Sequence, residues 1–531
     1  MKKLFIDTRK LDKACRERYA LSEELMMENA ACALESRVLK IASRLKKEAK
    51  LKNRENVSVV VLCGSGNNGA DGYVLARKLS RRSGFLIRVL SVSEPKSELC
   101  VLQCCRARKS GAQTQSVKDI AEFERAESVF SACDILVECV FGSGFHGEFS
   151  REISALMAIA DSADCVRVAC DIPAGISEKG FCAENTFRAH YTVTMGADKL
   201  CLYSDEAKDF AGKIFCANLG VSRALFETSA EPAPESGAST SPKEYVYPAA
   251  FLLEKSDLRL PFRTKNFVNK GSFGHAVIAS GEKIGASIIA GTAALSFGAG
   301  LVTLVNSDFA SKSGLSVPCE LMSASEVPQS VSAIAMGCGL GKNNGKARAF
   351  FKLILQSRRA LPCVIDADCF YEEELPSFLR ALSQRKIGAV LTPHPKEFSS
   401  LLRLCGLGDF SASECSRRRP EMIDLFCRAF SDVVLLVKGS NPQIGVFSSD
   451  NKGSSTRLFV NPHGNASLAK AGSGDVLTGL ICALLAQGLD PLSAALNASL
   501  AHSLASKSLA KKNNNYALTP LALINALSTL R

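Results

Sequence analysis

Short apolar runs recur along this chain, each ending in glycine or acidic residues and followed by a helix-forming stretch. Residues 57–63 form a continuous β-branched run of the kind that makes a strand buried on both faces. Residues 165–170 repeat the arrangement, with Asp171 at the end of the run, and further units follow from residue 270. This alternation predicts an α/β fold built on doubly wound parallel sheets, with the functional site along the carboxyl edge of the strands.

A stretch without apolar periodicity divides the chain. Residues 228–242 are rich in proline, serine, glutamate and alanine, and cannot bury a core. With 531 residues, the chain is also too long for one ordinary core. We therefore expect an N-terminal domain with a Rossmann-like doubly wound sheet over residues 1–227, a linker over 228–245, and a C-terminal α/β domain over 246–531.

Composition narrows the choice of partners. The net charge of +12 suits polyanionic ligands such as nucleotides, but no basic run is interleaved with aromatics, which argues against a nucleic-acid surface. The 21 cysteines include no pair of Cys-x-x-Cys motifs, and several lie in apolar runs, which indicates reduced thiols. The first apolar run stops at Asp7, and no uncharged apolar run is long enough to span a bilayer. We expect a cytoplasmic protein without a membrane partner.

A Gly-Ser-Gly-Asp stretch, residues 472–475, leads directly into the apolar pattern of a buried helix. The backbone N–H groups of Gly472, Ser473 and Gly474 and the positive end of the helix dipole suit phosphate oxygens. Asp475 would then lie beside the phosphate and could accept the proton of a hydroxyl about to be phosphorylated. The alternative is a simple turn with Asp475 as a helix cap, but the surrounding chain favours the phosphate site.

A second glycine-rich loop follows the run at 57–63. Its glycines have the G-x-G-x-x-G spacing of dinucleotide-binding loops: Gly64, Gly66 and Gly69. A further strand over 85–92 ends near Glu94, which could meet a ribose, so a nicotinamide-dependent oxidoreductase is one interpretation. Three side chains in this loop argue against an oxidoreductase, because they offer more hydrogen bonding than a dinucleotide-binding loop requires: Asn67, Asn68 and Asp71.

Taken together, the two halves resemble the bifunctional NAD(P)H-hydrate repair enzymes, in which an NAD(P)HX epimerase is fused to an ADP- or ATP-dependent NAD(P)HX dehydratase of the ribokinase-like fold. The resemblance covers nearly all of the chain except the linker. It rests on ordered blocks that include LMMENAA, CGSGNNGADGY and CDIPAGISEKG in the first half, and KGSFGHAVIASG, LTPHPKEF, VLLVKGS and AKAGSGDVLTG in the second.

For the C-terminal domain, the resemblance implies phosphoryl transfer from ADP or ATP, with magnesium, to the ring hydroxyl of S-NAD(P)HX. Phosphate then leaves, and NADH or NADPH is restored. Asp475 would be the base and contact the substrate. The other implied substrate-binding residues are Ala286, Gly339 and His394. The implied nucleotide-binding residues are Lys438, Gly439, Ser440, Gly472, Ser473 and Gly474.

For the N-terminal domain, the resemblance implies epimerisation of R- and S-NAD(P)HX, with Lys96 near the reactive ring and Glu138 also catalytic. The implied substrate-binding residues are Asn67, Asn68, Gly69, Ala70, Asp71, Gly142, Ser143, Gly144, Phe145, His146, Gly147, Glu148 and Asp171. A potassium ion would be held by Asn68, Glu138 and Ala174. This chain has Ala70, Glu138 and Ala174 where the family has glycine, aspartate and serine, and Ala174 offers no side-chain oxygen.

Two alternatives remain open. The C-terminal domain could be a ribokinase-like small-molecule kinase, although the LTPHPKEF block and the epimerase-like partner domain argue against this. The N-terminal domain could be an inactive binding or dimerisation module beside an active dehydratase; our hypothesis is an active but altered epimerase. We also expect a homo-oligomer. The sequence does not choose between ADP and ATP, or between NADHX and NADPHX.

Overall fold

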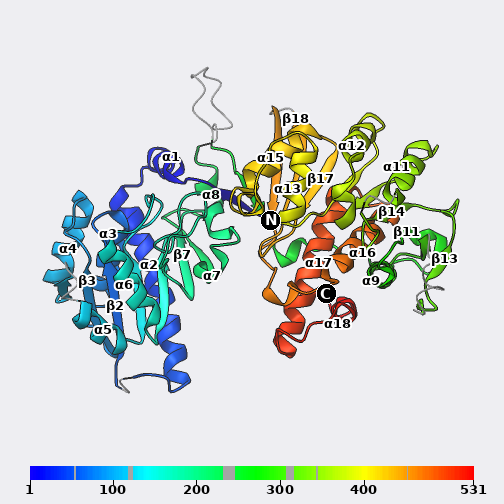
Figure 1. The fold of residues 1–531 in the computed structure, drawn as a ribbon. Helices are drawn as coiled ribbons and strands as arrows, with labels where there is room; N and C mark the ends of the chain where they lie inside the picture. The colour runs from blue at the N-terminus through cyan, green and yellow to red at the C-terminus, as the bar shows by residue number, and fades with distance from the viewer. Residues whose placement is uncertain (53–54, 118–122, 231–245, 306–315, 343–344, 451–452) are drawn as a thin grey trace. The chain divides into compact units, whose positions relative to one another are not determined.

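The computed structural model describes residues 1–531 except 53–54, 118–122, 231–245, 306–315, 343–344 and 451–452 (Figure 1). The chain divides into two compact units. The N-terminal unit contains residues 3–249, and the C-terminal unit contains residues 1–2 and 250–531. The predicted domain boundaries stay a prediction, and most of the predicted linker, residues 231–245, lies outside the described residues.

The N-terminal unit is built on a seven-stranded parallel sheet with the order β4-β3-β2-β5-β6-β7-β9. Its strands are β2 (Val57–Cys63), β3 (Phe85–Ser91), β4 (Gln113–Ser116), β5 (Ile135–Cys139), β6 (Val166–Cys170), β7 (Tyr191–Met195) and β9 (Lys213–Ala217). The chain runs outward from β2 to β4 and then returns to β5 on the other side of β2. The order therefore reverses between β2 and β5, and ligands of doubly wound sheets bind at such a switch point.

Helices cover both faces of this sheet (Figure 1). The helices of the unit are α1 (Arg9–Tyr19), α2 (Glu23–Lys47), α3 (Asn67–Leu79), α4 (Glu98–Lys109), α5 (Phe123–Ser131), α6 (Arg151–Ser162), α7 (Lys208–Ala211) and α8 (Arg223–Glu227). Val59 and Val61 of β2 pack into the core that α2, α3 and α4 share, whereas Val60 and Leu62 pack into the core beneath α6. Side chains of a strand alternate between faces, so a run buried on both sides must be apolar throughout.

The C-terminal unit is built on a second sheet with the order β13-β12-β11-β14-β15-β16-β17-β18-β19-β10. Its strands are β10 (Ala250–Leu252), β11 (His275–Ala279), β12 (Leu301–Val305), β13 (Met322–Ala324), β14 (Ala333–Met336), β15 (Cys363–Ile365), β16 (Ala389–Leu391), β17 (Val433–Val437), β18 (Gln443–Asp450) and β19 (Gly453–Val460). The strands from β13 to β17 are parallel to one another, and β17, β18 and β19 are antiparallel. The parallel part brings several strand carboxyl ends to one edge.

One helix, α16 (Ser473–Ala486), forms the centre of this unit and is buried from Val476 to Ala486. It packs against α9 and α17 and against strands β11, β14 and β15. A side chain at Gly479 would clash with the Ala290 carbonyl of α9, so this glycine permits the close helix contact. The remaining helices are α9 (Ile284–Ser296), α11 (Lys346–Gln356), α12 (Leu375–Gln384), α13 (Pro395–Leu404), α14 (Ala412–Arg417), α15 (Arg419–Ala429), α17 (Pro491–Lys512) and α18 (Pro520–Leu527).

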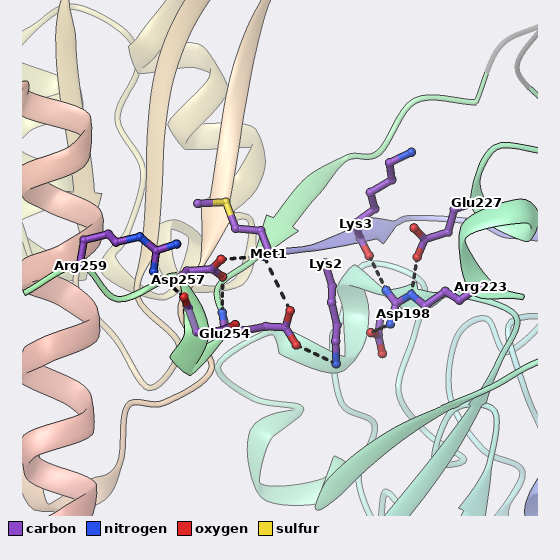
Figure 2. Close-up of polar contacts among 10 residues, drawn as sticks. Met1, Lys2, Lys3, Asp198, Arg223, Glu227, Glu254, Asp257 and Arg259 are labelled. Carbon is purple, nitrogen blue, oxygen red and sulfur yellow. Dashed lines mark hydrogen bonds and ion pairs between the residues drawn. The ribbon is translucent and has the colours of Figure 1, made fainter. Parts of the chain in front are cut away.

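Polar contacts fix the first residues of the chain (Figure 2). Within the C-terminal unit, the Met1 ammonium lies 2.8 Å from Asp257 Oδ1, and Lys2 Nζ lies 3.1 Å from Glu254 Oε1. Within the N-terminal unit, strand β1 (Lys2–Phe5) pairs in parallel with β8 (Asp198–Lys199). Arg223 donates to Asp198 Oδ2 at 2.6 Å, beside this pairing. No helix in the described part of the chain is both long and apolar enough to cross a membrane.

Candidate active sites

In the C-terminal unit, the Gly-Ser-Gly-Asp stretch forms the start of α16. Gly472 precedes the helix with φ +86°, and a side chain there would come within 2.6 Å of Pro520 Cγ, so both backbone and space require glycine. Ser473 Oγ donates to the Leu468 carbonyl at 2.7 Å, and the buried ring of His502 lies 2.9 Å from the Ser473 carbonyl. These contacts hold the loop so that the first N–H groups of α16 face outward from the helix end.

Asp475 lies in the first turn of α16, in a partly enclosed environment. Burial and the nearby Asp366 carboxylate raise the pKa of Asp475 to about 6, although the Cys338 thiol donates a hydrogen bond to it and Lys438 lies close by. A carboxylate whose pKa approaches neutrality is well matched to removing a proton from a hydroxyl. The structure therefore gives Asp475 the properties of a general base beside a helix N-terminus.

A buried ion pair lies directly beside this turn. Lys438 follows β17 and Asp366 follows β15, and Lys438 Nζ lies 2.8 Å from Asp366 Oδ1. Thr478 of α16 donates to the other Asp366 oxygen at 2.8 Å. Burial disfavours the charged ammonium, but Asp366 and Glu397 outweigh it, and the pKa of Lys438 is raised. A side chain at Gly474 would lie 3.4 Å from Lys438 Nζ, so the ammonium faces the loop predicted to bind phosphate.

The residues predicted to contact hydrated cofactor come from three loops. Gly339 has φ +61°, and a side chain there would approach Ala286 Cβ within 3.1 Å, so these two residues are neighbours. His394 caps α13: its Nδ1 accepts from the backbone of Glu397 at 3.3 Å, and its Nε2 lies 3.2 Å from Glu397 Oε1. Glu397 Oε2 in turn lies 3.8 Å from Lys438 Nζ. Glu397 thus connects His394 to the ion pair of Lys438 and Asp366. Gly439 and Ser440, which follow Lys438 in the chain, are exposed.

Several residues of this site were not found from the sequence. Asp366 follows a short apolar run, as Asp171 does, and this position at a strand end was a usable signal. Glu397 lies within the LTPHPKEF block but was given no role. Cys338 and His502 carry no such signal, because a thiol in an apolar run and a histidine within a long helix resemble ordinary core residues.

In the N-terminal unit, the candidate site lies at the switch point between β2 and β5. A side chain at Gly64 would clash with the Val140 backbone, and a side chain at Gly69 would clash with the Gly64 backbone. The two glycines therefore allow these backbone segments to approach closely. Asn68, in the first turn of α3, donates from Nδ2 to the Phe141 carbonyl at 2.8 Å. Its Oδ1 is buried and has no hydrogen-bond partner among the described residues. This atom is available to a ligand.

Asp171, at the end of β6, has the left-handed conformation φ +66°, which is unfavourable for a residue other than glycine and is frequent at functional sites. Its Oδ1 accepts from Lys199 Nζ at 2.6 Å and from the Met195 amide at 3.1 Å. Its Oδ2 faces Gly142, where an added Cβ would lie 3.1 Å away. Lys199, which the sequence reasoning missed, is completely buried and holds one carboxylate oxygen while the other faces the predicted substrate loop.

A second carboxyl group, Asp71, lies close to Asp171. Burial and the Asp171 charge raise the pKa of Asp71 well above its ordinary value, although a weak contact from the Cys170 thiol at 3.9 Å opposes this. The two neighbouring carboxyl groups therefore have different environments: Asp171 is paired with the Lys199 ammonium, whereas burial and the Asp171 charge raise the pKa of Asp71 and favour its protonated form. Such a difference in environment lets one carboxyl group act as base and the other as acid.

The other predicted residues of this unit surround the same edge. The loop of residues 142–148 follows β5, and its Phe145 is buried against Phe141 and Phe149, with ring centroids 5.4 and 5.0 Å away. Gly69 and Ala70 are buried in α3. The Lys96 amide donates to the Ser65 carbonyl at 2.8 Å, which places the backbone of Lys96 beside the glycine loop. Ser143, Gly144, His146, Gly147 and Glu148 lie at least partly exposed along the loop.

Glu138 allows a test of the predicted potassium site. Its carboxylate is completely buried, with Oε1 accepting from the Val140 amide at 2.6 Å and Oε2 from the Ala174 amide at 3.0 Å. Burial raises the pKa of Glu138 to about 7 despite these backbone hydrogen bonds. The Glu138 carboxylate is surrounded by N–H donors, which suit an anion rather than a cation, and the Ala174 carbonyl already accepts from the Phe187 amide at 2.9 Å. This donor set does not fit a potassium ion, and we assign potassium no step in the reaction.

The folds and the two sites define a two-unit α/β enzyme, with an aspartate in the first turn of a buried helix in one unit and a carboxyl pair at a switch point in the other. The family model described as NAD(P)H-hydrate dehydratase matches residues 276–529, and the model described as YjeF-related protein N-terminus matches residues 23–201. The bifunctional NAD(P)H-hydrate repair enzyme Nnr of Helicobacter pylori is 39% identical, over 98% of this chain and 98% of its own length. The chain belongs to this family of bifunctional NAD(P)H-hydrate repair enzymes.

The chain is similar to further proteins. The relative of the same name from Coxiella burnetii is 30% identical, over 90% of each chain. A solved structure described as the ADP/ATP-dependent NAD(P)H-hydrate dehydratase from Bacillus subtilis, co-crystallized with ATP/Mg2+, is 24% identical, covers 53% of this chain and 97% of its own, and has a TM-score of 0.42. The family and the fold class predicted from the sequence are confirmed.

Proposed function

We propose that the C-terminal unit dehydrates S-NAD(P)HX at the expense of ADP or ATP. Asp475 removes the proton from the ring hydroxyl as that oxygen attacks the terminal phosphorus of the nucleotide. The amides at the start of α16 and the Lys438 ammonium stabilise the charge on the transferred group. Phosphate then leaves the ring carbon together with the neighbouring ring proton, and the double bond of NADH or NADPH is restored.

The observation that carries this proposal is the position of Asp475. A carboxylate with a pKa of about 6 lies in the first turn of a helix whose N-terminus faces the partly buried Lys438 ammonium. When bound, the magnesium ion that the resemblance implies would neutralise part of the negative charge of the nucleotide phosphates. Within the described ranges, no group of three or more His, Cys, Asp or Glu side chains could hold a metal ion, so we expect the phosphates themselves to supply much of its coordination.

We propose that the N-terminal unit epimerises R- and S-NAD(P)HX, so that both forms reach the dehydratase. The hydroxyl-bearing carbon can invert if an acid protonates the hydroxyl, which leaves as water and gives a ring iminium that keeps the neighbouring ring proton. Water then adds to the other face while a base accepts its proton, so an acid and a base must lie close together. Asp171, held by Lys199, and Asp71, whose raised pKa favours the protonated form, supply them. This supports an active epimerase despite Glu138 and Ala174. We further place the protein in the cytoplasm, as a homo-oligomer without nucleic-acid partners.

A mixed preparation of R- and S-hydrated NADH tests both parts. With magnesium and ADP or ATP, the absorbance of reduced nicotinamide should recover completely. No recovery with either nucleotide contradicts the dehydratase and favours a small-molecule kinase. Fast partial recovery, followed by a slow phase that an added active epimerase accelerates, indicates that the N-terminal unit is inactive. Comparison of ADP with ATP, and of hydrated NADH with hydrated NADPH, then establishes the preferred substrates.

A further inference from the structure

Two cysteines lie at the amino-terminal edge of the N-terminal sheet, at the other end of the strands from the candidate epimerase site. Cys133 lies two residues before β5 and is completely buried. Cys165 directly precedes β6, is partly exposed, and lines a cavity of about 800 Å³. The cavity gives a small molecule from solution a route to Cys165 but not to Cys133.

The strand register brings the two cysteines within disulfide range. Strands β5 and β6 are adjacent and parallel, with Ile135 opposite Val166, and the Val166 amide donates to the Asp134 carbonyl at 2.9 Å. Cys165 therefore lies opposite Asp134, and Cys133 is one residue earlier in the chain. Cys133 precedes β5, in a turn in which its amide donates to the Phe130 carbonyl at 3.1 Å, so it does not follow the alternation of the strand and its side chain enters the same core cluster as Cys165. An offset of one residue at a strand spacing of about 4.8 Å and a rise of about 3.3 Å corresponds to a Cα separation of roughly 6 Å. Natural disulfides have Cα separations of about 4.4–6.8 Å.

The side chains meet, and their surroundings make them unequal. Both pack into the core cluster beneath α6, where each thiol affects the pKa of the other. The Cys133 thiol, the Arg167 guanidinium and the Lys52 ammonium lower the pKa of Cys165 against the effects of burial and of Asp164. The pKa of Cys133 is raised by its interaction with Cys165 and by burial. Cys165 is thus suited to react first, as a thiolate, and Cys133 is suited to attack the oxidised Cys165 afterwards.

We propose that Cys133 and Cys165 are a peroxide-sensitive dithiol that closes to a disulfide. The Cys165 thiolate attacks one oxygen of hydrogen peroxide, the O–O bond breaks, and hydroxide leaves, so that Cys165 becomes a sulfenic acid. Cys133 sulfur then attacks the Cys165 sulfur, its proton and the sulfenic hydroxyl leave as water, and the S–S bond forms. Two thiols are oxidised, and one peroxide is reduced to two waters. A dithiol reductant reverses the modification.

A second cysteine pair on the same two strands is a built-in comparison. Cys139 and Cys170 lie at the carboxyl ends of β5 and β6, and each thiol likewise affects the pKa of the other. Both are completely buried, and burial raises the pKa of each. Because the thiolate is the reactive form and the oxidant must reach it, this pair should oxidise at least about ten times more slowly.

The test uses the full chain, reduced and then exposed to a small excess of hydrogen peroxide. Remaining thiols are alkylated, and the tryptic peptides are analysed by mass spectrometry. Residues 126–151 carry Cys133 and Cys139, and residues 152–167 carry Cys165, so fragment ions must distinguish the two cysteines of the first peptide. We expect the two peptides to be joined through Cys133 and Cys165, and separated again by dithiothreitol.

Variants distinguish a specific site from general oxidation. In Cys133→Ala, Cys165 keeps Arg167 and Lys52 but loses the effect of the Cys133 thiol, so it should form a sulfenic acid more slowly, and a dimedone probe should trap that acid because no second thiol resolves it. In Cys165→Ala, Cys133 should stay reduced. The proposal is overturned if Cys165 stays reduced while the exposed Cys105 is oxidised. It is also overturned if Cys139 and Cys170 are joined as rapidly, since oxidation would then reflect unfolding. These two results come from the unmodified chain and do not depend on the folding of either variant.

Discussion

Replacing Asp475 by asparagine should strongly slow dehydration and at the same time stabilise the C-terminal unit. The pKa of Asp475 is about 6 in the folded protein, against an ordinary value of 3.8. The folded state therefore binds the proton more tightly than the unfolded state, and stability is lost as the pH rises from the lower value to the higher one. Ionising Asp475 costs about 3 kcal/mol at pH 7 as an upper limit, but only about 0.6 kcal/mol at pH 4. Asparagine carries no charge and avoids this cost.

Denaturant unfolding of Asp475→Asn and of the parent at the two pH values measures this difference, using the transition of the C-terminal unit. The variant should gain stability at pH 7 and little at pH 4, while the rate of dehydration falls about a hundred- to ten-thousand-fold. Asp490→Asn is a matched control, because Asp490 also lies at a helix start but accepts from the Ser493 amide at 3.0 Å, and its pKa is lowered. It should gain no stability at pH 7. An Asp475 variant that gains nothing, or gains equally at both pH values, refutes the reasoning.

Further predictions concern both units. Below pH 6, kcat/KM of the dehydratase should fall about tenfold per pH unit as Asp475 is protonated, and a flat pH profile would exclude it as the base. Lys438→Met leaves its buried carboxylate partner unpaired and should destabilise the C-terminal unit by about 3–5 kcal/mol in denaturant unfolding. Lys199→Met should slow epimerisation while dehydration of pure S-hydrate is unchanged; equal loss of both activities would indicate general misfolding. The rate of epimerisation by the parent should not change when potassium is added. Glu138→Asp combined with Ala174→Ser should make this rate depend on potassium. If the double variant behaves like the parent, these two positions do not control epimerisation.

Local structure followed closely from the sequence. The run at 57–63 is strand β2, and the run expected over 85–92 is Phe85–Ser91. The stretch at 472–475 begins α16, as expected from a glycine before an apolar helical pattern. These features depend on backbone conformation and on burial periodicity, and both are written into neighbouring residues. The site residues carried over from the family resemblance likewise lie at strand and helix ends.

Which strand ends become neighbours was decided only by the tertiary structure. Asp366 and Lys438 are far apart in the chain, yet their pairing orients a charge toward α16. The high pKa of Asp475, the support of Asp171 by Lys199, and the contact of Cys133 with Cys165 likewise depend on burial and on groups from distant segments. Sequence periodicity reports which face of an element is buried, but the electrostatic environment of a side chain is set by whatever the fold packs against it.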